Sequence, residues 1–191
     1  MSSRTRDGGP KPEQVPDEQV ALVHRDGHVL GGAPRSVVRR DNLLHSATAV
    51  LVRDGSGHIY VHRRSDSKDW APAHWDAAAG GVIVVGEEPE ESAVRELGEE
   101  LGITGVPLRA LVTHLYQDEG TRCFEHAFEA VWSGPVRHQP EEVAEGRWMT
   151  LGELAGMLAD PSIAFVPDTR QLLGRLADAG IGDYGTLASP G

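Results

Sequence analysis

Three glutamates near the middle of the chain have the spacing and the chemistry expected of a metal site. Glu96, Glu99 and Glu100 stand at positions i, i+3 and i+4, which share one face of an α-helix. Their carboxylates would converge there, and like charges at that spacing repel one another. Carboxylate oxygens are hard ligands, and Mg²⁺ in proteins is bound by a few carboxylates together with water and substrate phosphates. The spacing therefore indicates a magnesium site acting on a phosphate compound, with a solvated acidic helix face as the alternative.

The residues around these glutamates predict the helix that must position them. Pro89 suits a first helical turn, where its missing N–H would have no partner, and Gly102 suits the position just past a helix end. Between them, apolar side chains fall within one arc of about 100°, on the side opposite the glutamates. These apolar residues are Ala93, Val94, Leu97 and Leu101. We therefore expect one face of the helix to pack on a core and the other to present carboxylates.

The complete run from Gly81 to Ile103 resembles the signature of a known family, the Nudix box. The signature is a glycine, five residues, a glutamate, seven residues, then Arg-Glu-hydrophobic-any-Glu-Glu-any-Gly-hydrophobic, and all nine defined positions match. The resemblance implies a Nudix fold and hydrolysis of a diphosphate with Mg²⁺, or with Mn²⁺ as an alternative. The metal ligands that it implies are Glu96, Glu99 and Glu100, with Glu87 in the same acidic cluster. It also implies that Arg95 steadies the glutamates by ion pairing.

Basic residues and glycines gather just before the box. A predicted strand ends in Arg63 and Arg64, and Lys68 follows closely. Arginine side chains match phosphate oxygens in shape and charge, although one of them could pair with a structural carboxylate instead. Gly80 and Gly81 allow the backbone to come close to another group, which in the resembled family is the metal and the diphosphate. We therefore expect these five residues to contact the substrate.

The flanks of the box carry a second resemblance, to the isopentenyl diphosphate isomerase branch of the superfamily and to the bacterial isomerase-like Nudix proteins. The similar segments are 43–47, 62–64, 68–72 and 75–76. In the isomerases a cysteine supplies the acid, and its position falls here on Gly80, which has no side chain. Isomerisation is therefore disfavoured and a diphosphate hydrolase is the main hypothesis. A non-catalytic module that senses a nucleotide sugar is a third option, disfavoured by the intact acidic box.

The general base stays open at this point, because the resemblance indicates that it varies among Nudix enzymes. One candidate is a box glutamate, either Glu99 or Glu100. Glu125 on a later predicted strand is a second, and Glu141 or Glu142 in a late loop is a third. Arg95 is grouped with the catalytic residues because it would hold the box glutamates in place.

Hydrophobic periodicity and turn signals predict one α/β (α+β) domain with a mixed β-sheet sandwiched between helices. Strands are expected at 20–23, 28–30, 45–52, 58–64, 106–116, 122–132 and 147–149, and helices at 36–40, after 89, after 151 and at 167–179. Residues 1–18 are polar and rich in Gly and Pro, which predicts a disordered tail. Residues 19–180 would form the Nudix domain, and 181–191 a loose C-terminal tail.

Composition limits the partners and the compartment. The 191 residues carry a formal net charge of −11, so no basic field would attract a nucleic-acid polymer, whereas a small metal-complexed diphosphate is compatible. No run of 18 apolar residues and no signal-peptide core is present, so no membrane contact is expected. Cys123 is the only cysteine, which favours a small core residue in a cytoplasmic protein. Nudix proteins are often dimers, so a homodimer is an option.

Overall fold

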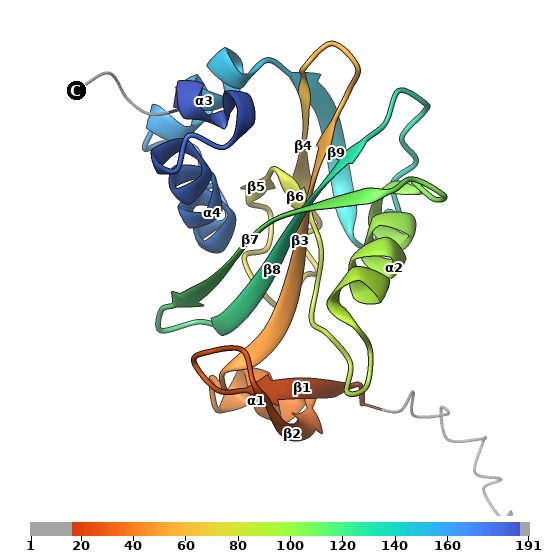
Figure 1. Ribbon diagram of the computed structural model, residues 1–191, viewed down its shortest axis with the longest axis vertical. Helices are drawn as coiled ribbons and strands as arrows, with labels where there is room; N and C mark the ends of the chain where they lie inside the picture. Colours follow the sequence, from red (N-terminus) through yellow and green to blue (C-terminus); the bar gives the residue numbers. More distant parts are fainter. Residues whose placement is uncertain (1–16, 188–191) are drawn as a thin grey trace, which may run out of the picture.

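The computed structural model describes residues 17–187 (Figure 1). Its strands are β1 (Gln19–Val23), β2 (Val29–Pro34), β3 (His45–Arg53), β4 (Ile59–Arg64), β5 (Trp75–Asp76), β6 (Ala78–Ala79), β7 (Leu108–Gln117), β8 (Arg122–Val131) and β9 (Val143–Met149). Its helices are α1 (Arg35–Arg40), α2 (Pro89–Leu101), α3 (Leu151–Ala159), α4 (Pro167–Asp178) and the 3₁₀-helix η1 (Gly182–Leu187). No helix within residues 17–187 is both long and apolar enough to cross a membrane.

The sheet is mixed and is organised around β3. This strand runs parallel to β8 along its whole length, from the His45–Cys123 pair to the Arg53–Val131 pair. It also pairs antiparallel with β1, β4 and β6, while β7 extends the sheet beyond β8 and β9 extends it beyond β4. A strand that is covered on both faces needs apolar residues on both, which explains the nearly continuous apolar run in β3.

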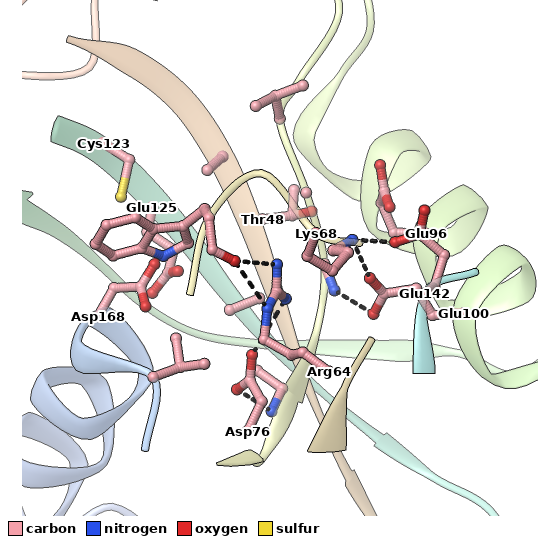
Figure 2. A pocket seen from close by; sticks show the side chains of 18 of the residues that line it. Thr48, Arg64, Lys68, Asp76, Glu96, Glu100, Cys123, Glu125, Glu142 and Asp168 are labelled. Carbon is pink, nitrogen blue, oxygen red and sulfur yellow. Dashed lines mark hydrogen bonds and ion pairs between the residues drawn. The ribbon is translucent and has the colours of Figure 1, made fainter. Parts of the chain in front are cut away.

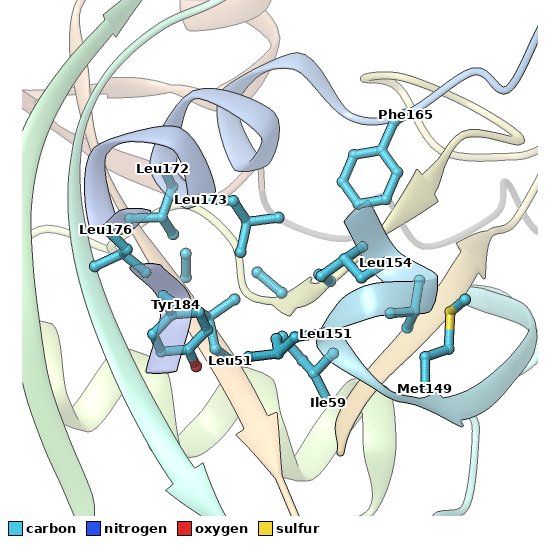
Figure 3. Close-up of a cluster of buried hydrophobic side chains, with 14 of the residues drawn as sticks. Leu51, Ile59, Met149, Leu151, Leu154, Phe165, Leu172, Leu173, Leu176 and Tyr184 are labelled. Carbon is cyan, nitrogen blue, oxygen red and sulfur yellow. The ribbon is translucent and has the colours of Figure 1, made fainter. Parts of the chain in front are cut away.

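Helices cover both faces of this sheet (Figure 1). On one side lie α3, α4 and η1, which pack against Leu51 and Ile59 in one apolar cluster (Figure 3). On the other side lies α2, whose Leu97 packs with Val50 and Val52 in a second cluster. Consecutive residues of a strand point to opposite faces, so β3 supplies side chains to both clusters. The predicted fold class, a mixed sheet between helices, is confirmed.

Helix α2 begins and ends where the sequence predicts. Pro89 is its first residue, and just before it Glu88 forms a reciprocal capping box with Glu91. Gly102 follows the last residue in the left-handed conformation, at φ 66°, which a glycine adopts without strain. Glu96, Glu99 and Glu100 are therefore carried by a helix with two well-defined ends.

The buried face of α2 differs from the predicted one. Its buried residues are Ser92, Ala93, Leu97, Glu100 and Leu101. Val94, which we expected to face the core, is 42% exposed. That expectation was wrong because burial on this helix does not follow apolar character alone: its buried side also carries Ser92 and Glu100. The glutamates therefore do not share a solvated face opposite the core.

The loose C-terminal tail predicted for residues 181–191 is wrong as far as residue 187. This segment forms η1, and its Tyr184 is fully buried. The Tyr184 hydroxyl donates a hydrogen bond to Glu129 at 2.8 Å, and Arg53 pairs with both carboxylate oxygens of Asp183 at 2.8 and 2.7 Å. These partners are far away in the sequence, so no local pattern reveals them. Residues 188–191 lie outside the described residues.

The disordered tail predicted for residues 1–18 is described only at its end. Asp17 accepts hydrogen bonds from the backbone N–H and the hydroxyl of Ser36. Glu18 pairs with Arg35 at 3.3 Å. These two residues therefore contact α1, and residues 1–16 lie outside the described residues.

Candidate active site

A cavity of about 440 Å³ lies where α2, β3, β8 and the start of α4 approach one another. In Figure 2, Glu96 and Glu100 project into it from α2 on one side, and Glu125 and Asp168 lie on the other. Arg64 is drawn between the two groups. Charged side chains are rarely buried unless they are paired or bind something, so this cavity is the candidate active site.

Gly80 and Gly81 bring the backbone close to both β3 and the box helix. A β-carbon at position 80 would lie 2.0 Å from the carbonyl oxygen of Thr48, which leaves no room for a side chain. A β-carbon at position 81 would lie 2.6 Å from a carboxylate oxygen of Glu96 and would push it away. The Gly80 N–H donates a hydrogen bond to Glu100 at 3.2 Å. The two glycines therefore form the cavity wall against which the box glutamates rest.

Arg95 binds three glutamates of the box. Its guanidinium nitrogens lie 2.9 and 3.1 Å from the two carboxylate oxygens of Glu87, 2.7 Å from Glu96 and 3.2 Å from Glu99. These hydrogen bonds hold the pKa of Glu87 below its usual value. One arginine therefore orients three carboxylates and offsets part of their charge.

Glu100 is the most deeply buried glutamate of the box, with 1% of its surface exposed. Burial raises its pKa to about 7, against the opposing influence of the nearby Lys68 and Arg64. The ammonium nitrogen of Lys68 lies 3.3 Å from a Glu100 oxygen and also pairs with Glu142. Lys68 thus connects the acidic helix to the loop after β4 and to the loop before β9.

Two of the three predicted basic residues line the cavity, namely Arg64 and Lys68. Arg64 donates to the Trp70 carbonyl at 3.1 and 3.3 Å and lies 3.6 Å from Asp76. Arg63 is not among the lining residues, in contrast to the prediction, and its side chain pairs with Glu145 at 3.1 Å. Neighbouring residues of a strand point to opposite faces, so Arg63 and Arg64 cannot both enter the cavity.

The wall opposite α2 holds Cys123 and Glu125 from β8 and Asp168 from the first turn of α4. The cysteine sulfur and one oxygen from each carboxyl group lie within 4.8 Å of one another. Burial raises the pKa of Glu125 well above its usual value and that of Asp168 to about 6, and neighbouring carboxylates reinforce both shifts. Of the late-loop candidates, Glu142 lines the cavity and Glu141 does not.

Comparison with known proteins decides the family. A family model described as NUDIX domain matches residues 43–169, which include the box together with Cys123, Glu125 and Asp168. This chain belongs to the Nudix family. This Nudix protein is 47% identical to the uncharacterized Nudix hydrolase orf19 of Rhodococcus erythropolis, over 82% of this chain and 90% of that relative. It is 38% identical to the uncharacterized Nudix hydrolase YfcD of Escherichia coli strain K12, over 82% of this chain and 84% of that relative.

A solved structure shares the arrangement of the Nudix chain. The crystal structure of DR0079 from Deinococcus radiodurans matches it with a TM-score of 0.71 at 26% identity, over 83% of this chain and 98% of that one. The predicted Nudix fold is therefore confirmed. The chain is a Nudix hydrolase, an enzyme that hydrolyses diphosphate compounds.

The box carboxylates fit a divalent cation, which Nudix hydrolases typically use. Glu96 and Glu100 are both withdrawn from solvent, and burial raises the pKa of each although Arg95 and Lys68 lie beside them, so a further cation would stabilise their charged forms. The Glu99 side chain is 54% exposed and lies at the rim of the cavity. Carboxylate oxygens at the edge of a cavity are the donors that Mg²⁺ prefers.

Sequence reasoning missed the residues that reach the cavity from distant parts of the Nudix chain. The charged ones are Glu18, Arg35, Arg39, Asp76 and Asp168. Asp76 accepts hydrogen bonds from the Thr169 hydroxyl at 2.7 Å and from the Ala78 N–H at 3.0 Å. Asp168 follows the proline that begins α4, and an acidic residue is common in a first helical turn, so nothing in the sequence set it apart.

Proposed function

We propose that this Nudix hydrolase uses Mg²⁺, with Mn²⁺ as an alternative, to cleave the diphosphate linkage of a small nucleoside diphosphate derivative or a related diphosphate. The observation that carries the proposal is the pairing of charges in one cavity. Glu96 and Glu100 supply carboxylates on one side, and Arg64 and Lys68 supply cations close to them. A metal-bound diphosphate carries both kinds of charge and would match both groups.

In this proposal Glu96, Glu99 and Glu100 hold the metal, which when bound screens phosphate charge and lowers the pKa of a bound water. Arg95 keeps the carboxylates converged through its bonds to Glu87, Glu96 and Glu99. Gly80 and Gly81 exclude side chains from the wall beside them. The chain's own contribution is therefore a set of carboxylates that is already oriented before substrate binds.

The basic residues would bind the phosphate oxygens. Lys68 already reaches Glu100 and Glu142, so its ammonium group is placed at the boundary between metal ligands and substrate. Arg64 is held by the Trp70 carbonyl, which keeps its guanidinium in the cavity. Fixed cations of this kind stabilise the charge that develops when a phosphate group leaves.

For the general base we propose a box glutamate, Glu99 or Glu100, since both line the cavity on the metal side. Glu125 is the alternative, and in Figure 2 it lies on the side of Arg64 that is opposite to Glu100. Replacing Glu125 by glutamine separates the two assignments. A loss of turnover in Glu125→Gln as large as that in Glu100→Gln would favour Glu125.

Isomerisation of isopentenyl diphosphate is the disfavoured alternative. The isomerase acid would stand at position 80, where even a β-carbon would lie 2.0 Å from the Thr48 carbonyl oxygen. Cys123 comes from β8 and cannot replace it at that position. Incubation with isopentenyl diphosphate in D₂O should give no deuterated dimethylallyl diphosphate above the uncatalysed rate, and its formation at an enzymatic rate would overturn this proposal.

The function is tested by incubating the full chain with Mg²⁺ or Mn²⁺ and a panel of nucleoside diphosphate derivatives, dinucleoside polyphosphates, nucleotide sugars and prenyl diphosphates. We expect metal-dependent release of a phosphate product from at least one class. Binding of a nucleotide sugar without turnover of any class would instead support the sensing module. Sedimentation of the same sample measures whether the enzyme is a homodimer, which the proposal does not require.

A further inference from the structure

The wall opposite the box helix carries three metal-ligating side chains, of which Cys123 and Glu125 are buried and Asp168 is partly buried. Cys123 and Glu125 are two residues apart on β8, so both point to the same face of the sheet. Asp168 reaches them from α4. One sulfur and two carboxylate oxygens lie within 4.8 Å of one another, and Figure 2 shows them apart from Glu96 and Glu100. This group is a thiol-carboxylate cluster, a different donor set from that of the box.

Buried polar atoms in this cluster and on the neighbouring strand β7 have no hydrogen-bond partner within residues 17–187. Glu125 is 4% exposed, and within residues 17–187 no group donates a hydrogen bond to its Oε2. His114 on β7 is 3% exposed, and neither of its ring nitrogens has a hydrogen-bond partner in that part of the chain. The nearest approach is 3.4 Å, between His114 Nε2 and Glu125 Oε2. Buried polar groups without partners are rare and commonly mark a site that an ion or water completes.

We propose that Cys123, Glu125 and Asp168 form a second cation site, for a divalent transition metal such as Zn²⁺. A thiolate with two carboxylates suits a borderline-soft ion, whereas Mg²⁺ prefers oxygen alone. Three protein ligands leave one position open to the cavity for water or substrate. Binding releases the thiol proton and any carboxyl proton to solvent. The ion would supply the positive charge that this wall lacks.

Cobalt is a suitable probe because the chain has one cysteine. The full-length protein is stripped with a chelator, given excess Mg²⁺ to occupy oxygen-only sites, and titrated with Co²⁺. We expect a sulfur-to-cobalt charge-transfer band that saturates at one equivalent, and Zn²⁺ should abolish it by competition. Since Cys123 is the only sulfur of its kind, the band reports this cluster alone. The readout is metal binding, so it stands or falls independently of the hydrolase proposal.

Variants of the cluster, compared with variants outside it, make the test decisive. Cys123→Ser should lose the band, and Glu125→Gln should weaken Co²⁺ binding by more than the roughly 10–100-fold that follows loss of an outer-shell partner. Glu100→Gln on the box helix should keep the band. Glu129→Gln is the matched control, because Glu129 lies on the same strand and face but bonds Tyr184 outside the cavity. Circular dichroism confirms that each variant is folded.

Two results would overturn the proposal. One is the absence of any charge-transfer band in the folded wild type, which would mean that the cluster holds a shared proton. The other is a band that Glu125→Gln and Asp168→Asn leave at full affinity, which would mean that Co²⁺ binds the thiol without the carboxylates. If Cys123→Ser does not fold, the Glu125→Gln and Asp168→Asn titrations decide the question.

Discussion

The two acidic walls of the cavity differ in how their negative charge is balanced. On the α2 wall, Arg95 contacts Glu87, Glu96 and Glu99, and Lys68 contacts Glu100. On the opposite wall, no arginine or lysine within residues 17–187 forms an ion pair with Glu125 or Asp168. The carboxylates of the first wall and Arg95 come from one continuous segment, and Lys68 adds a cation from the loop after β4. The second is assembled from β8 and α4, and burial, reinforced by neighbouring carboxylates, raises the pKa of its carboxyl groups.

The largest effect expected is on turnover when the first wall loses a carboxylate. Glu100→Gln keeps the shape of a buried side chain and removes a metal-binding charge. We expect turnover at limiting Mg²⁺ to fall by about 10²–10³-fold, the range seen when one electrostatic stabiliser is removed. Steady-state kinetics on the best substrate of the panel measure it, with Glu129→Gln as the matched control. A rate near that of the wild type would show that the α2 wall does not hold the catalytic metal.

The pH dependence of the free energy of unfolding should show a separate contribution from each wall. Because the pKa of Glu100 is about 7 in the folded protein and lower when the chain unfolds, the folded state binds more protons between those values. Without metal, the free energy of unfolding should therefore fall as pH rises from about 4.5 to about 7, by roughly 3 kcal/mol from this group. Asp168, with a pKa of about 6, acts with the same sign over a lower window.

Urea unfolding in the presence of a chelator, across this pH range, measures these contributions. Glu100→Gln should flatten the upper part of the stability curve, and Asp168→Asn the lower part. Curves that both variants leave unchanged would contradict the assigned protonation of both walls. Saturating Mg²⁺ should flatten the upper part in the wild type, because metal binding keeps Glu100 deprotonated.

A smaller effect is expected when the charge of Arg95 is kept but its shape is changed. Arg95→Lys retains a cation yet cannot reach Glu87, Glu96 and Glu99 together, since the planar fork is lost. We expect turnover to fall by about tenfold, the low end for a group that orients metal ligands. The apparent Mg²⁺ affinity should fall with it. Unchanged affinity would show that the convergence of the first wall does not depend on Arg95.

The smallest effect concerns the two sides of α2 itself. Val94→Ala should change the free energy of unfolding by no more than about 0.5 kcal/mol, because Val94 is largely exposed. Leu97→Ala, three residues on and 1% exposed, should cost about 2–5 kcal/mol. Thermal or urea unfolding of the two variants compares them directly. A larger loss of unfolding free energy in Val94→Ala would show that Val94 packs on the core after all.

The same contrast explains what the sequence could predict. Pro89, Gly102 and the spacing of the glutamates lie within one stretch, so the helix, its ends and its chemistry follow from local rules. The burial predicted for Val94 was wrong because apolar residues are also common on protein surfaces. The second wall depends on the parallel pairing of β3 with β8 and on the docking of α4, which place Glu125 and Asp168 together. Contacts of that kind have no signature in a single sequence.

The position of η1 has a consequence for the order in which the domain can be completed during synthesis. A chain is made from its N-terminus, so β3 and β4 exist long before Tyr184 is added. Tyr184 nevertheless belongs to the same apolar cluster as Leu51 and Ile59 (Figure 3), and its neighbour Asp183 pairs with Arg53, 130 residues earlier. One side of the core therefore stays open while the chain is being made, and it is completed when η1 packs onto the sheet.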